Sequence, residues 1–349
     1  MFNSLKTKQR RLEQDCLFCH IVPLLVDTDE PGESDTQFDC EAQNPSRDDD
    51  DEVDTFADYL YSIDLPEEFI LRHFADLISG FATICIPGGR AVRSAYGAEI
   101  LIPANATIEV VLGGGEDVEH EHVPGLNLTP SVLVVRILGD NGAEQPLESR
   151  DRLAGAIFGI GNEPFSNSMR TQYSRCSNGL LNFVPADGHP LISNGVMDVK
   201  LNFSLQTRDI YKLRPVLREE TARLLGVRQL NATVDHVMFC VAPGTKPVSW
   251  SAFSHLGPYD SYFNSQHRRC DKLSALMHEM GHNYWLHHSG HPHARKPQYG
   301  DRTGVVSIKG SQIALLIYSL IPCFELVKSN ADGSYVRDGF SPCWQVASV

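Results

Sequence analysis

The sequence lacks a long hydrophobic run. No stretch approaches the eighteen or so consecutive apolar residues that a membrane-spanning helix needs, and the best candidate, Ile313 to Ile321, is too short. Basic residues are nowhere concentrated enough to indicate nucleic-acid binding, and there is no internal repeat. We therefore expect no transmembrane segment and no nucleic-acid partner. With 42% hydrophobic and 21% charged residues, a chain of 349 residues has room for a buried core and for two domains.

Little net negative charge lies outside one segment. Between Asp27 and Asp54 there are thirteen Asp or Glu residues and one Arg, which carry −12 of the formal net charge of −14. The block from Asp48 to Glu52 indicates a solvated, disordered stretch. A calcium-binding interpretation of this block lacks the spaced Gly and the terminal Glu of a calcium loop.

The first 26 residues give an ambiguous targeting signal. A basic segment precedes an apolar run from Cys16 to Val26, but Glu13, Asp15 and His20 interrupt the pattern and no small-residue cleavage site follows. We interpret the segment as a poor secretory signal or an incorrectly chosen start. Cys16 to His20 also matches the c-type haem attachment pattern, without an evident axial partner.

Cysteines and glycosylation acceptors indicate the compartment. Nine cysteines are an odd number, so at least one thiol is unpaired. Cys40 or Cys85 could cap a metal in a latent proenzyme, although a structural role is the simpler interpretation of either. Four Asn-X-Ser/Thr triplets favour an extracellular or secretory-pathway glycoprotein. They begin at Asn105, Asn127, Asn202 and Asn231.

Four regions follow from the pattern along the chain. Residues 1–55 form an acidic leader that we expect to be disordered, and residues 56–150 form a small β-rich domain after one helix near 66–79. Residues 151–306 alternate helix-like and strand-like segments, which indicates an α/β (α+β) domain. Residues 307–349 form a divergent or truncated tail. The clearest strands are expected at 99–103, 107–112, 131–138, 198–205 and 234–241, and the clearest helices at 208–225 and 271–285.

The segment from Asp271 to Trp285 carries the strongest motif. Asp271 is a plausible N-cap, and His278 and His282 are four residues apart, so their side chains stack on one helix face. Glu279 lies between them, which completes the HExxH arrangement of zinc peptidases. An apolar stripe on the adjacent face predicts an amphipathic helix. The stripe comprises Leu273, Leu276, Met277, Met280 and Tyr284.

A third ligand would complete a catalytic zinc site. His288 stands at the metzincin distance from His282, with His287 as the adjacent competitor. Zn²⁺ bound by three neutral imidazoles keeps a fourth position for water and lowers its pKa towards about 7. Glu279 would take the proton as water attacks the scissile carbonyl and would deliver it to the leaving amine. His291 and His293 are better explained as solvated surface residues.

At these residues the chain resembles the gametolysin-like zinc metallopeptidase family, a branch of the metzincin clan found among algal extracellular enzymes. The resemblance covers roughly residues 151–306. It implies a zincin-type catalytic domain with a twisted mixed sheet and an active-site helix, endopeptidase activity, and cell-wall or extracellular-matrix glycoproteins as substrates. The β-rich domain would then be propeptide-like or accessory. The similar segments are residues 173–186, 194–199, 237–244, 250–253, 277–283 and 288–290.

The sequence departs from the family pattern at three places. Trp285 stands where metzincins have a Gly that ends the helix in a left-handed conformation. Val306 occupies the position of the Met beneath the zinc, and from Ser307 onward the resemblance stops. If the helix continued through Trp285, His288 would be carried away from the metal.

Three hypotheses follow from the pattern. We prefer a secreted zinc endopeptidase that acts on protein or glycoprotein substrates. The second hypothesis is a zinc-binding pseudoenzyme of the same fold, impaired by Trp285 and Val306, in which Gly at position 285 should restore some activity. The third is a His-rich metal-buffering protein.

Overall fold

The computed structural model describes residues 16–28, 34–42, 60–78, 82–94, 96–112, 128–160, 167–257, 259–286, 327–329 and 335–337. The chain divides into two compact units. Unit 1 comprises Met1–Leu24, Thr36–His120 and Asp209–Glu219, and unit 2 comprises Leu25–Asp35, Glu121–Arg208 and Glu220–Val349. The helix α5 (Ile210–Leu225) contributes its first ten residues to unit 1.

Unit 1 is built from short, mostly antiparallel strands and the helix α2. Strand β1 pairs with β4 and β4 with β7, β2 pairs with β3, and β5 pairs with β6, all antiparallel, whereas β3 and β6 are parallel. The elements are β1 (Cys16–Thr28), β2 (Ser34–Ala42), β3 (Leu60–Ile63), α2 (Glu67–Ile78), β4 (Thr83–Pro87), β5 (Arg90–Ser94), β6 (Gly97–Leu101) and β7 (Glu109–Leu112).

Two disulfides fasten β1 into unit 1. Cys16 is bonded to Cys85 of β4, and Cys19 is bonded to Cys40 of β2. Leu17, Cys19 and Ile21 are buried in the core of this unit. The expectation of a disordered leader is therefore wrong for Cys16–Thr28 and Ser34–Ala42, because their apolar side chains are core residues of strands. The acidic block from Asp48 to Glu52 lies outside the described residues.

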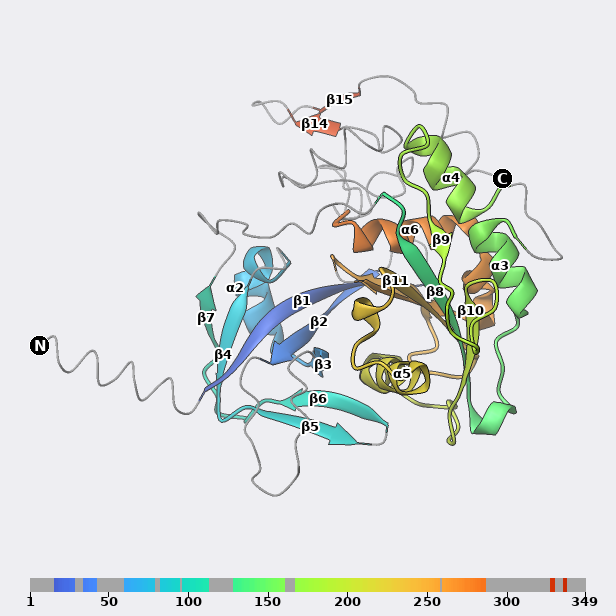
Figure 1. The fold of residues 1–349 in the computed structure, drawn as a ribbon. Coiled ribbons are helices and arrows are strands. Elements are labelled where there is room, and N and C mark those ends of the chain that lie inside the picture. The colour runs from blue at the N-terminus through green and yellow to red at the C-terminus, as the bar shows by residue number, and fades with distance from the viewer. Residues whose placement is uncertain are drawn as a thin grey trace, which may run out of the picture. The chain divides into compact units, whose positions relative to one another are not determined.

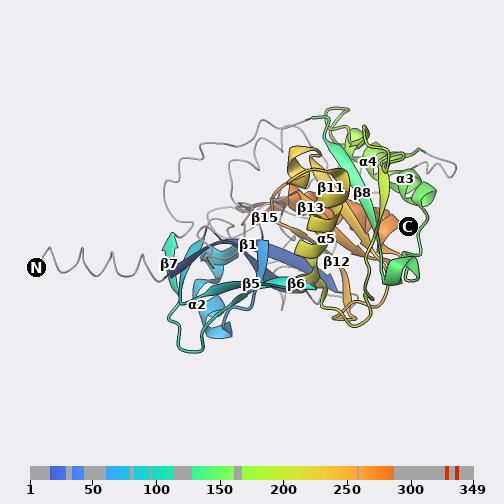
Figure 2. The ribbon, with the colours of Figure 1, turned by 60° about the horizontal axis from the view of Figure 1, so that its bottom comes forward.

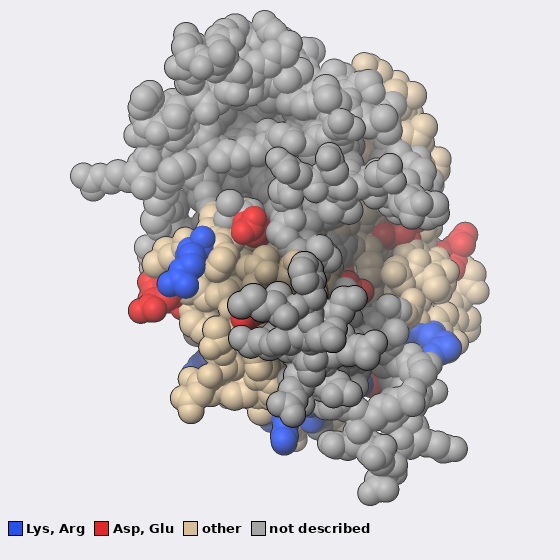
Figure 3. All heavy atoms as spheres, turned by 90° about the vertical axis from the view of Figure 1, so that its left-hand side faces the viewer, with Lys and Arg blue, Asp and Glu red and all other residues tan. Residues whose placement is uncertain are grey.

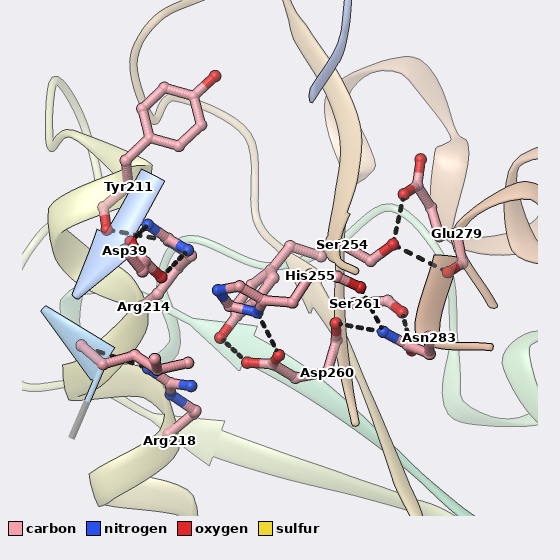
Figure 4. Close-up of polar contacts among 12 residues, drawn as sticks. Asp39, Tyr211, Arg214, Arg218, Ser254, His255, Asp260, Ser261, Glu279 and Asn283 are labelled. Carbon is pink, nitrogen blue, oxygen red and sulfur yellow. Dashed lines mark hydrogen bonds and ion pairs between the residues drawn. The ribbon is translucent and has the colours of Figure 1, made fainter. Parts of the chain in front are cut away.

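A buried ion pair ties α5 to β2 within unit 1. Both amino nitrogens of the Arg214 guanidinium contact the Asp39 carboxylate at 2.6 Å, and each side chain is 1% exposed (Figure 4). On the next turn of α5, Arg218 donates to the Leu60 carbonyl oxygen of β3. Two charges removed from water in this way are tolerated only as a pair, because either one alone would be left without compensation.

Unit 2 is built on a mixed sheet. Strand β8 lies between β10 and β11 and is parallel to both, β11 is parallel to β13, and β12 runs antiparallel to β13. The short β9 adds to the start of β8. The strands are β8 (Ser131–Leu138), β9 (Val184–Pro185), β10 (Val196–Lys200), β11 (His236–Val241), β12 (Trp250–His255) and β13 (Asp260–Asn264).

Three helices pack against one face of this sheet. They are α3 (Arg150–Phe158), α4 (Met169–Cys176) and α6 (Leu273–Asn283). Alternate residues of the strands, such as Val132 and Val134 of β8 and Met238 of β11, share one hydrophobic core with the helices. Figures 1 and 2 show α3 and α4 together on the same side of β8. Unit 2 is thus a mixed α/β domain with a twisted mixed sheet, as the alternating pattern predicts.

The boundary expected at residue 150 is not the boundary of the units. Strand β8 occupies the predicted residues 131–138, but it lies at the centre of the sheet of unit 2 instead of in a separate β-rich domain. A buried apolar run of this kind fits the interior of a parallel sheet, where both faces are covered. The tail is described only at β14 (Val327–Ser329) and β15 (Tyr335–Arg337), which pair with each other.

Two further observations bear on possible partners. None of the described helices is long and apolar enough to cross a membrane. On the face shown in Figure 3, the described Lys and Arg residues lie singly among Asp and Glu residues and form no continuous basic patch. The expected absence of a nucleic-acid partner stays a prediction.

The buried ion pair predicts a large loss of stability when one partner is removed. We expect Asp39→Asn to lower the free energy of unfolding by roughly 3–5 kcal/mol, because the Arg214 charge stays buried without its counterion. Urea unfolding followed by circular dichroism measures the change. Arg93→Ala is the matched control, since its partner Glu219 also lies on α5 but the pair is 35% and 45% exposed. Its cost should stay below about 1 kcal/mol.

A paired replacement separates charge from packing. The double variant Asp39→Leu with Arg214→Met removes both buried charges and should regain most of the lost stability. Equal stability of Asp39→Asn and the parent chain would contradict this account of unit 1.

Candidate metal centre

Helix α6 begins two residues later than the sequence pattern suggests. Its N-cap is Lys272, without a side-chain cap, and Asp271 belongs to the short 3-10 turn Arg269–Asp271. The prediction of Asp271 as N-cap is wrong, because its buried carboxylate forms an ion pair with Arg152 of α3. A guanidinium partner 119 residues away cannot be read from local capping preferences.

The apolar stripe of α6 faces the core as expected. Leu276, Met280 and Tyr284 are buried in the cluster shared with α3 and α4, and Leu273 and Met277 are partly buried against it. The Tyr173 hydroxyl of α4 donates to the Met277 carbonyl oxygen at 2.8 Å. Burial raises the pKa of this hydroxyl, so it stays protonated and keeps its role as donor.

His278 and His282 point their Nε2 atoms at one another. The two atoms are 3.0 Å apart, and the rings are nearly perpendicular. The Nδ1 atom of His282 lies 2.5 Å from the Leu286 carbonyl oxygen. Because a carbonyl oxygen only accepts, the proton of the neutral imidazole resides on Nδ1, which leaves the Nε2 lone pair for another partner.

This arrangement fits two ligands of a zinc ion. Two imidazoles bound at 2.0–2.1 Å with tetrahedral geometry place their nitrogen atoms about 3.3 Å apart, close to the spacing seen here. His282 is buried and His278 is half-buried. The Leu286 carbonyl oxygen holds the outer nitrogen of His282 in the way that is usual for a metal-binding histidine.

Glu279 is held by β12. The Ser254 hydroxyl oxygen lies 2.9 Å from Oε2 of Glu279 and 2.8 Å from its backbone carbonyl oxygen, and both residues are fully buried (Figure 4). Glu279 directly follows His278 in α6. Ser254 therefore fixes the rotamer of the Glu279 carboxylate, which is the expected proton acceptor of the HExxH motif.

The end of α6 is anchored by a buried polar network. The Asn283 amide donates to the carbonyl oxygens of His255 and Asp260, and its own oxygen accepts from the Ser261 hydroxyl. Nδ1 of His255 contacts the Asp260 carboxylate at 2.5 Å, and the Tyr262 hydroxyl donates to the same carboxylate (Figure 4). The β12–β13 connection is thereby fixed to the helix end.

The chain turns at Trp285, and the helix does not continue. Trp285 has φ +63°, its N–H donates to the His282 carbonyl oxygen, and the Leu286 N–H donates to the Gly281 carbonyl oxygen. This is the Schellman arrangement that normally contains Gly at the left-handed position. A side chain there costs about 1–2 kcal/mol. The chain therefore turns at Trp285 as it does in metzincins with Gly, and the helix does not continue through it.

Two further predicted positions lie outside the described residues. These are His288, the expected third ligand, with its competitor His287, and Val306, the residue in the Met position. The convergence of three imidazoles therefore stays a prediction. His278, Glu279 and His282 are the members of the expected site that the structure describes.

Most cysteines among the described residues are in disulfides. Cys16, Cys19, Cys40 and Cys85 are all in disulfides, so neither the haem-attachment interpretation nor a latency role for Cys40 or Cys85 holds. A third disulfide joins Cys240 of β11 to Cys270, just before α6. Cys176 of α4 is a free, buried thiol, and burial raises its pKa to about 11.

One compact group of possible ligand atoms is not a metal site. Among the described residues, Glu148, Cys240 and Cys270 bring such atoms together. The two sulfur atoms are bonded to each other, so neither can offer a thiolate. Glu148 accepts from the Ser265 hydroxyl at 2.5 Å, and burial raises the pKa of its carboxyl.

Sequence reasoning missed the residues that support the motif. Ser254, Asn283 and the Leu286 carbonyl oxygen position the ligands and the carboxylate, although none belongs to HExxH. Asn283 directly follows the motif, and Ser254 directly follows the family-like segment 250–253. Closeness to these motifs is the signal by which the sequence could have indicated the two residues. The contacts themselves could not be predicted, because they join residues up to 28 positions apart.

Comparison with known proteins identifies one family. The model described as gametolysin peptidase M11 matches residues 147–314, a segment that runs from just before α3 to beyond α6. The resemblance that the sequence motifs indicate is thereby confirmed. No curated protein and no solved structure gives a significant match to the chain.

A buried histidine that contacts Tyr284, at the end of α6, predicts that the stability of unit 2 falls in acid. His236 lies 3.2 Å from the Tyr284 hydroxyl, and burial lowers its pKa from 6.5 to about 4. Above pH 6.5 the residue is neutral in both states. As the pH falls towards about 4, only the unfolded chain takes up the proton, so unit 2 loses on the order of 3 kcal/mol.

Melting temperatures measured from pH 7.5 to 4 test this expectation. His236→Gln, which cannot titrate, should show a shallower decline than the parent chain across this window, whatever its stability at neutral pH. Parallel declines of the two proteins would contradict a neutral buried His236.

Proposed function

We propose that the protein is a zinc-dependent endopeptidase with its active site on α6, because residues 147–314 match the gametolysin peptidase model. The observation that carries the proposal is the pair of Nε2 atoms 3.0 Å apart with the His282 tautomer fixed by the Leu286 carbonyl oxygen. A shared cation requires a lone pair from each imidazole; the His282 tautomer leaves one on its Nε2, and Nε2 of His278 would supply the other. The parallel strands with one antiparallel strand and an active-site helix also support a metzincin-like fold for unit 2.

Each residue of the site has a defined task. His278 and His282 would hold the ion, with His288 as the third ligand. Bound zinc would supply a Lewis acid that acidifies water and polarises the scissile carbonyl. Glu279 would accept a proton from the attacking water and pass it to the leaving amine. Ser254 would keep the Glu279 carboxylate in the rotamer needed for that transfer.

The substrate class and location are also proposals. The family likeness points to extracellular-matrix or cell-wall proteins as substrates. Three disulfides and exposed acceptors support an extracellular glycoprotein, because disulfides persist in oxidising compartments. Asn105, Asn202 and Asn231 are exposed, as an acceptor must be, and Asn127 lies outside the described residues. The described strands of unit 1 would form the accessory or propeptide-like part.

Substitution of Glu279 tests the mechanism. Glu279→Gln keeps the size of the side chain but removes the proton acceptor, so hydrolysis of a casein substrate should fall by at least about 10²-fold. Zinc content measured by mass spectrometry should stay at one ion per chain. A chelator should abolish the activity of the parent chain, and zinc should restore it. Undiminished hydrolysis by Glu279→Gln would rule out this role.

The third ligand is tested by a matched pair of variants. His288→Ala should weaken zinc binding and remove activity, whereas His287→Ala, one residue away, should do neither. Zinc affinity from competition with a chelating dye is the measurement. A larger loss in His287→Ala would assign the third ligand to that residue instead.

The pseudoenzyme remains the second candidate, favoured by the non-glycine residue at position 285. One zinc ion per chain without measurable hydrolysis would select it.

A further inference from the structure

The Trp285 indole packs against one particular residue, Gly257. A Cβ atom built on Gly257 would lie 2.2 Å from Cζ2, 2.3 Å from Cε2 and 2.8 Å from Cη2 of the Trp285 indole. The indole therefore rests directly on the bare backbone of Gly257, in the connection between β12 and β13. Any side chain at residue 257 would occupy the space that the ring fills.

Gly257 also caps the helix. Its N–H donates to the His282 carbonyl oxygen at 3.0 Å, the same oxygen that accepts from the Trp285 N–H at 2.8 Å. Gly257 itself has φ +91°, a conformation that side chains rarely adopt. One glycine thus provides both a hydrogen bond to the helix end and a surface for the ring that follows it.

The turn at Trp285 decides where the next carbonyl points. Leu286 follows directly, and its carbonyl oxygen lies 2.5 Å from Nδ1 of His282. A different backbone conformation at residue 285 would move this oxygen and release the His282 ring. The outer nitrogen of a ligating His is normally held in this way, and loss of the partner weakens metal binding.

We propose that Trp285 is a positioning residue of the metal centre: its indole, packed on Gly257, holds the left-handed turn that keeps the Leu286 carbonyl oxygen on His282. The metal part of this inference rests on the proposed zinc function. The Trp then replaces the usual glycine of the turn, and a glycine at residue 257 compensates for it by leaving room for the indole. This is the opposite of the pseudoenzyme hypothesis, in which Trp285 spoils the site.

The end of α4 supplies a matched control. Asn178 also occupies a left-handed position after a helix, with φ +54°. Its N–H donates to the Arg175 carbonyl oxygen, and the Gly179 N–H donates to the Ser174 carbonyl oxygen, so the motif is the same. Asn178 is exposed. Asn178→Gly therefore reports the effect of glycine in this motif where the position is open to solvent.

The experiment is a double-mutant cycle on the full-length, disulfide-bonded chain. It compares the parent with Trp285→Gly, Gly257→Ala and the double variant, and adds Trp285→Phe and Asn178→Gly. Melting temperature is measured with a chelator present, and zinc affinity is measured by competition with a chelating dye, with zinc alone as the ligand.

The expected result has two parts. Gly257→Ala should lower the melting temperature of the parent by about 5 °C or more, and by less when Trp285 is already Gly, because only the strain of a side chain at φ +91° then remains. Trp285→Gly should weaken zinc binding about tenfold, and Trp285→Phe should lose less because a ring remains. Asn178→Gly should leave the zinc affinity unchanged and the melting temperature equal or higher.

The overturning results are equally distinct. Equal effects of Gly257→Ala in both backgrounds would show that the indole contributes nothing at Gly257. Zinc binding by Trp285→Gly as tight as that of the parent, or tighter, would refute the positioning role and favour the pseudoenzyme. Failure of the parent chain to bind zinc would overturn the proposed function and the metal part of the inference, while the melting temperatures would still decide whether the indole holds the turn.

Discussion

The candidate metal centre depends on the direction in which the chain leaves α6. Two imidazoles share a cation only if each offers a lone pair to the same point, and His282 does so because the Leu286 carbonyl oxygen holds its other nitrogen. That oxygen is in place because residue 285 is left-handed. The Gly257 N–H and the Asn283 amide tie the same helix end to the β12–β13 connection. Ligand geometry is therefore set by contacts just beyond the motif.

Elements with a strong local pattern could be predicted from the sequence. The predicted strand 131–138 coincides with β8, the predicted helix 208–225 is close to α5, and the stripe of α6 faces the core. HExxH spacing correctly brings His278 beside His282, because four residues make about one helical turn. Family motifs extended the prediction from a helix to a peptidase.

Features set by partners distant in sequence could not be predicted. Trp285 looks like damage to the motif until Gly257 is seen beneath its ring, 28 residues earlier. Asp271 has the side chain of an N-cap, but Arg152 binds it. The boundary expected at residue 150 separates β8 from its own sheet, because membership of a sheet depends on strands that come later in the chain. The apolar run of β1 resembles an imperfect targeting signal for the same reason, since the disulfide to its partner β4 spans 69 residues.

The two disulfides of β1 have a consequence for how the protein is prepared. A protein prepared without residues 1–55, on the view that they are a disordered leader, would lose Cys16, Cys19 and Cys40 together with the strands that carry them. Cys85 would then be left as a thiol on β4, beside a sheet that has lost two strands. Such a molecule has both the reactive sulfur and the unsatisfied strand edge that favour covalent dimers and aggregates. Poor behaviour of a shortened protein would therefore reflect the cut itself.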